Sequence, residues 1–146
     1  MRVPDLRSLA AVLVLATTAA CASAPSQEMS DARQAINSAR SADAAAYAPR
    51  SMDNAEQLLG EAEQSLKQGR YDAARDDALE ARQAAIKARQ VAVAIADARA
   101  AVEEAKAKGS AWLSVERLID EAQAAGRQGD EGRAWELATE AKRRLQ

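Results

Sequence analysis

The stretch AARDDALEARQAAIKARQVAVAI, residues 73–95, decides the fold of this chain. Its apolar positions alternate at spacings of four and three residues, and they are Ala74, Ala78, Ala81, Ala85, Ala88, Ala92 and Ile95. This heptad spacing places them on one face of a helix that packs along its length against other helices. Ala is the strongest helix former and is small enough for two helices to approach closely. The stretch therefore predicts a long helix with close neighbours.

Downstream, the apolar stripe changes phase and continues on the same helical spacing. After the shift its members are Ala98, Val102 and Ala105. The pattern predicts either one helix over residues 72–108 or two helices with a bend near Ile95. Gly109 is expected to end this helix, and Ser110 could cap the next helix through its hydroxyl.

Besides the helix that follows Ser110, three further helices are predicted around this one. The first covers about residues 31–47 and stops before Pro49, because the residue preceding a proline avoids the helical conformation. The second covers about 50–68 and ends at Gly69. The last follows Asp130, a suitable N-cap. The apolar stripe of the second helix is Met52, Ala55, Leu59, Ala62 and Leu66, and that of the last helix is Ala134, Ala138, Ala141 and Leu145.

The chain matches itself, which is typical of a repeat architecture. Ten residues between Glu56 and Ala81 recur unchanged 60 positions later, between Glu116 and Ala141. Upstream, the segment that starts at Asp31 matches the segment that starts at Asp97, at a spacing of 66. The first copy thus has six extra residues, near 42–49. We predict an all-α fold of antiparallel helical hairpins with a long central helix and no β-structure, duplicated as repeats of about 31–95 and 96–146.

Composition argues against several classes of function. Although 48% of the 146 residues are apolar, only 3% are aromatic and Phe is absent, so the core is expected to be shallow. The net charge of −2 does not favour nucleic acid, whose binding depends on clustered Lys and Arg. The chain has no His and a single Cys, so the usual metal ligand and general base are missing. The acidic group Asp76, Asp77 and Glu80 is interleaved with Arg and fits a solvated face. We predict no catalytic, cofactor or metal site, and no enzyme.

The N-terminus has the layout of a secretory signal over residues 1–20. Arg2 and Arg7 form a basic start, residues 9–16 an apolar run, and small residues lead up to Ala20. The apolar run is much shorter than the roughly 20 residues that a membrane-spanning helix needs. The chain is therefore expected to be exported.

Cys21 directly follows this segment. Thr18-Ala19-Ala20-Cys21 resembles the lipobox of bacterial lipoproteins, in which the Cys is acylated, although Thr18 stands where Leu is usual. The resemblance implies lipidation of Cys21, for example with palmitate, followed by a flexible tether over residues 21–30. Ala22, not being Asp, implies an outer-membrane protein that faces the periplasm. The alternative is an ordinary cut that leaves a soluble periplasmic protein without a lipid anchor.

The rare aromatic residues are the remaining candidate sites. Trp112 takes the stripe position of Met52 and is expected to anchor the core. Trp135 corresponds to Arg75 and lies beside the stripe of the last helix, so we consider it a possible partner contact. Tyr71 is expected to pack at the hairpin between the second and third helices.

Three resemblances to known families add to these expectations. Residues 66–74, LKQGRYDAA, look like the turn of a tetratricopeptide (TPR) hairpin, without the period of that family. The signal, the Cys, the Ala-rich helices and the Gly-x-Tyr-Asp-x-Ala hairpin together resemble bacterial envelope lipoproteins with domain of unknown function 4398. Residues 109–146 are similar to the SoxXA-binding proteins of thiosulfate-oxidising bacteria. The matching residues are Gly109, Trp112, Leu118, Ile119, Ala122, Gly129, Ala134, Leu137, Ala138 and Ala141.

The expected function is that of a non-enzymatic envelope lipoprotein, a helical scaffold or a protein-interaction module. Its expected partners are the membrane, through lipid, and another envelope protein. Self-association through a coiled coil along the central helix is a further expectation. The likeness to SoxXA-binding proteins implies, as the alternative, an accessory subunit of periplasmic sulfur oxidation that binds a c-type cytochrome enzyme.

Overall fold

The computed structural model describes residues 23–109 and 112–146, so the signal segment, Cys21 and Ser110 lie outside the described residues. Within these ranges the chain forms six helices and no strand. The helices are α1 (Ser26–Ser41), α2 (Ala44–Tyr47), α3 (Pro49–Lys67), α4 (Tyr71–Ala107), α5 (Leu113–Gln128) and α6 (Glu131–Arg143). The predicted all-α fold with a long central helix is confirmed.

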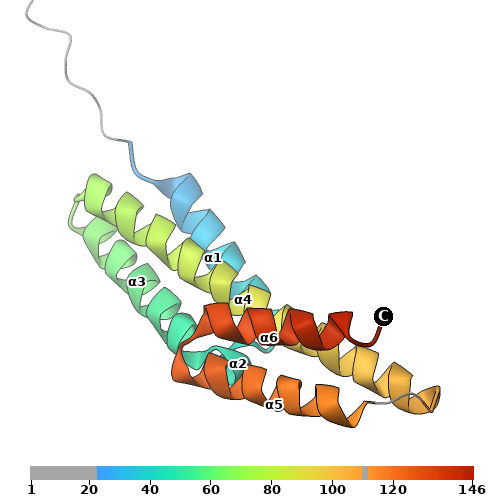
Figure 1. The fold of residues 1–146 in the computed structure, drawn as a ribbon. Coiled ribbons are helices and arrows are strands. Elements are labelled where there is room, and N and C mark those ends of the chain that lie inside the picture. Colours follow the sequence, from blue (N-terminus) through green and yellow to red (C-terminus); the bar gives the residue numbers. More distant parts are fainter. Residues whose placement is uncertain (1–22, 110–111) are drawn as a thin grey trace, which may run out of the picture.

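Helix α4 is the longest helix and packs against all the others. Its 37 residues give it a length of about 55 Å. Figure 1 shows α1 and α3 along its first half and α5 and α6 along its second half. We call α1, α2 and α3 with the part of α4 that packs on them the first unit, and α5 and α6 with the part of α4 that packs on them the second unit, so the two units share the middle of α4.

The heptad stripe of residues 74–95 forms the centre of the core. All seven of its members are buried, as are Ala98, Val102 and Ala105 beyond the phase shift. Of the two alternatives for this region, the structure has one helix that runs on through Ile95. The buried stripe shifts around α4 beyond Ile95, and different helices pack on it before and after the shift. Its residues are small, so this change of neighbours does not interrupt the backbone hydrogen bonds of α4.

The N-terminal helix differs from the prediction at both ends. It begins at Ser26, so residues 26–30 are helical and not part of a flexible tether. Met29 explains the early start: it is in phase with Ala32 and only 2% exposed. At the other end α1 stops at Ser41, and Asp43 has a left-handed backbone (φ 56°) before the short α2. The six extra residues of the first copy form this break.

The predicted helix ends at Gly69 and Gly109 are confirmed, both with positive φ. Asp130 caps α6 as predicted, since its carboxylate accepts a hydrogen bond from the Arg133 backbone N–H at 3.0 Å. Trp112 lies just before α5, which begins at Leu113, and its side chain packs against the main core cluster as predicted. Its ring is only partly buried, and the Lys106 ammonium lies 4.4 Å from its centroid.

Candidate interaction surface

Ion pairs between helices close the surface of the first unit. Two of them link α1 to α3 and one links α4 to α1. They are Arg33–Glu63 at 2.9 Å, Arg40–Glu56 at 2.9 Å and Arg75–Glu28 at 3.0 Å. The Arg75 and Glu28 side chains are 34% and 28% exposed, so they cover the seam between α1 and α4.

The second unit keeps one of these three links. Lys106 and Glu116, which correspond to Arg40 and Glu56 at the spacings of 66 and 60, form an ion pair at 3.3 Å between α4 and α5. Arg99 corresponds to Arg33 but has a different contact, since its guanidinium donates a hydrogen bond to the Tyr47 hydroxyl at 2.9 Å. This contact joins the second unit to α2.

The third link is replaced by apolar residues. Glu28 corresponds to Ala94, and Arg75 corresponds to Trp135. The preceding position is also changed, from Gln27 in the first unit to Val93 in the second. Trp135 is 50% exposed and Val93 is 43% exposed. Where the first unit has an ion pair across its seam, the second unit has an apolar surface open to solvent.

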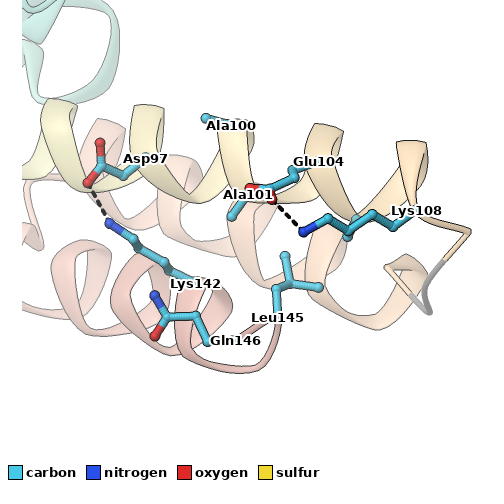
Figure 2. A pocket seen from close by; sticks show the side chains of 9 residues that line it. Asp97, Ala100, Ala101, Glu104, Lys108, Lys142, Leu145 and Gln146 are labelled. Carbon is cyan, nitrogen blue, oxygen red and sulfur yellow. Dashed lines mark hydrogen bonds and ion pairs between the residues drawn. The ribbon is translucent and has the colours of Figure 1, made fainter.

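This surface lines a groove between α4 and α6, which we call the α4–α6 groove. Its lining residues are Arg89, Gln90, Val93, Ala94, Asp97, Trp135, Ala138, Thr139 and Lys142. The Asp97 and Lys142 side chains form an ion pair across it at 2.8 Å, and beyond that pair it continues into the hollow of Figure 2. There Leu145 of the C-terminal turn faces α4, and Glu104 pairs with Lys108 at 2.6 Å.

The structure places Trp135 as the sequence suggested, beside the buried stripe and accessible. The sequence interpretation missed Val93 and Leu113, which is 72% exposed at the start of α5. A signal for Val93 appears only when the spacing of 66 is extended upstream of Asp31, where it pairs Val93 and Ala94 with the polar residues Gln27 and Glu28.

The titratable groups behave as parts of surface ion pairs. The pKa of Glu28 is lowered, first by its hydrogen bond with its own backbone and then by Arg75. Hydrogen bonds from Lys108 and Arg144 lower the pKa of Glu104 and Glu140 respectively. The pKa of Lys106 is raised, first by its hydrogen bond to Glu103. These shifts stabilise the charged form of each group and do not prepare it for proton transfer.

In residues 23–109 and 112–146, no group of three or more His, Cys, Asp or Glu side chains could hold a metal ion. Over the same residues, no helix is both long and apolar enough to cross a membrane.

Comparison with known proteins gives one result. No curated protein and no solved structure matches the chain. A family model, the domain of unknown function DUF4398, matches residues 27–110, which is more than half of the chain. The matched part covers α1 to α4, whereas α5 and α6 follow it. The chain belongs to the DUF4398 family.

Proposed function

We propose that the protein is a non-enzymatic lipoprotein of the bacterial cell envelope, attached to the outer membrane through lipid on Cys21. In the periplasm it serves as a helical scaffold or protein-interaction module. The observation that carries this proposal is the α4–α6 groove, an exposed apolar surface on a helical frame whose corresponding seam in the first unit is closed by an ion pair. Exposed apolar patches bordered by polar residues mark interaction sites.

The lipid anchor would determine which part of the molecule faces outward. Four residues, 22–25, separate Cys21 from α1, and even fully extended they span only about 14 Å. The first unit would therefore lie near the membrane. Val93 is 22 residues after the start of α4, which corresponds to about 33 Å along the helix axis. The groove would then be held away from the lipid, accessible to a partner in the periplasm.

Metabolic labelling tests the anchor. The wild-type chain and a Cys21→Ser variant are expressed in the native host with radioactive palmitate, and envelope fractions are compared. We expect label on the wild type alone and its recovery with the outer membrane. An unlabelled wild type would contradict the lipid anchor and favour the soluble periplasmic form.

Affinity purification from envelope extracts, read by mass spectrometry, tests the interaction role. We expect a specific envelope protein to be recovered with the wild type in stoichiometric amount. If no protein is enriched over an unrelated periplasmic bait, the scaffold role is contradicted.

The likeness of residues 109–146 to SoxXA-binding proteins supports a second candidate, an accessory subunit of periplasmic sulfur oxidation. This segment contains α5, α6 and Trp135, so the resemblance covers one side of the groove. The same purification separates the candidates, because the second one requires a c-type cytochrome among the recovered proteins.

A further inference from the structure

We propose that the α4–α6 groove binds a helix of a partner protein that presents an apolar side chain flanked by carboxylates. This inference rests on the proposed interaction role and adds the surface and the chemistry of the partner.

The apolar part of the site is formed by Trp135 and Val93, with Ala94 and Ala138 between them. A half-exposed Trp next to small residues leaves room for a large apolar side chain, and Trp is enriched at the centres of protein interfaces. The first unit shows the closed alternative, in which the Arg75–Glu28 ion pair spans the same place. The replacement of both charged residues removes the link that covered the seam.

The charge of the groove favours an acidic partner. Arg89 lines it and donates a hydrogen bond to the Ser38 hydroxyl at 3.1 Å, but among the described residues no carboxylate lies within ion-pair distance of Arg89. The other two charged residues of the lining, Asp97 and Lys142, pair with each other. Positive charge is thus in excess in the groove because of Arg89, on a chain whose net charge is −2. Carboxylates on a partner would complement it.

The shape of the groove suits a helix. Its lining residues appear in the same order on both sides, Val93 beside Trp135 and then Asp97 beside Lys142, so α4 and α6 run in the same direction. From Arg89 to Asp97, where the ion pair with Lys142 crosses it, the apolar part of the groove follows α4 for about 12 Å. That length accommodates about two turns of an amphipathic helix, which can insert an apolar side chain beside Trp135.

Two synthetic peptides serve as probes. Both are 18-residue amphipathic helices with the same Leu face, flanked by Glu in one and by Lys in the other. In a Trp112→Phe variant Trp135 is the only tryptophan, so its emission reports on the groove. We expect saturable binding of the Glu peptide with a shift of Trp135 emission to shorter wavelength. It should bind at least about tenfold more tightly than the Lys peptide, and more weakly at higher salt.

The first unit supplies a matched variant. The double substitution Ala94→Glu with Trp135→Arg copies the Glu28–Arg75 link into the second unit and should close the groove without unfolding it. By fluorescence anisotropy of labelled peptides, we expect it to weaken Glu-peptide binding at least about tenfold. Arg89→Gln should weaken only the Glu peptide, by several-fold. Leu113→Ala removes the most exposed large apolar side chain outside the groove. It should leave the affinities for the Glu peptide and the Lys peptide unchanged.

Three results would overturn the proposal. The first is equal affinity for the two peptides, and the second is unchanged binding by the closed variant. The third is a concentration-dependent dimer in sedimentation that the closed variant abolishes, since the occupant would then be a second copy of the chain. If the closed variant still recovers the envelope partner in affinity purification, the interaction role stands and only this groove is excluded.

Discussion

Gly126 of α5 lies directly against the backbone carbonyl of Tyr47 in α2, so that a Cβ atom at Gly126 would be 2.2 Å from the Tyr47 oxygen. The backbones of the two units are thus in close contact at this point. The position 60 residues earlier is Leu66, which packs on the small core cluster around Met29. The two copies thus differ here because the second copy packs against α2 at this position, which leaves no space for a side chain.

Gly126→Ala is expected to destabilise the protein by about 1–3 kcal/mol, because the added methyl group overlaps a backbone atom that cannot move without shifting α2. Urea unfolding followed by circular dichroism measures the change. Gly60→Ala is the matched control, since Gly60 lies within α3 and a Cβ there has no atom within 4 Å. We expect it to stabilise by about 0.5–1 kcal/mol through helix propensity. Equal effects of the two substitutions would contradict the close approach.

Asp130→Ala should destabilise the protein by about 1 kcal/mol, because the first turn of α6 would lose the acceptor of the Arg133 N–H. Asp130→Asn, which keeps a side-chain oxygen at the cap, should recover most of the loss. Thermal unfolding of the three proteins gives the comparison. A loss in the Asn variant as large as that in the Ala variant would show that the cap hydrogen bond is not the cause.

Acid should weaken the seam between α1 and α4. The pKa of Glu28 lies below its ordinary value of 4.5 in the folded chain, so its contribution to stability is present above pH 4.5 and is lost as pH falls through the lowered pKa. Carboxyl NMR titration of Glu28 measures that pKa directly. Arg75→Gln should raise it only part of the way, because the larger cause, the hydrogen bond to the Glu28 backbone, remains. A complete return to the ordinary value would assign the whole shift to Arg75.

A break in α4 between the units should be costly. Ala96 is exposed in the middle of this helix, so its substitution removes no core contact. Ala96→Gly should destabilise by about 1 kcal/mol and Ala96→Pro by about 3 kcal/mol or more, because Pro also removes a backbone hydrogen bond. Denaturant unfolding measures both changes. If the Pro variant were as stable as the Gly variant, α4 would not be a continuous helix at this junction.

Sequence periodicity predicted the parts of the fold that depend on one helix at a time. The heptad positions from Ala74 to Ile95 are all buried, and the two predicted glycine ends are correct. Met29 was in phase with Ala32 and could have extended the first helix backwards, but the polar residues before it obscured the pattern. The sequence does not decide whether α4 is continuous, because a shift in the phase of the stripe is compatible with a bend or with a change of neighbouring helices.

Contacts between the units were not predictable in the same way. Nothing around Gly126 distinguishes a glycine that makes room for a carbonyl from one that ends a helix. Trp112 packs against the core, as its alignment with Met52 predicts, but it does so from outside the helix, because α5 begins four residues later than the alignment with α3 would place it. In the groove, Trp135 is accessible as expected. Val93 and Arg89 belong to the groove because α6 packs beside α4, and the sequence does not show which helices are neighbours.

Because α4 supplies a helix to both units, no turn separates one copy from the next. In open-ended solenoids each repeat begins and ends in a loop, so recombination can add or delete repeats there. In this molecule, exchange between the copies would have to cut through the middle of a helix and keep its register. The gene is therefore expected to diverge by substitution within each copy, and the difference between the ion-paired seam and the apolar groove is of that kind.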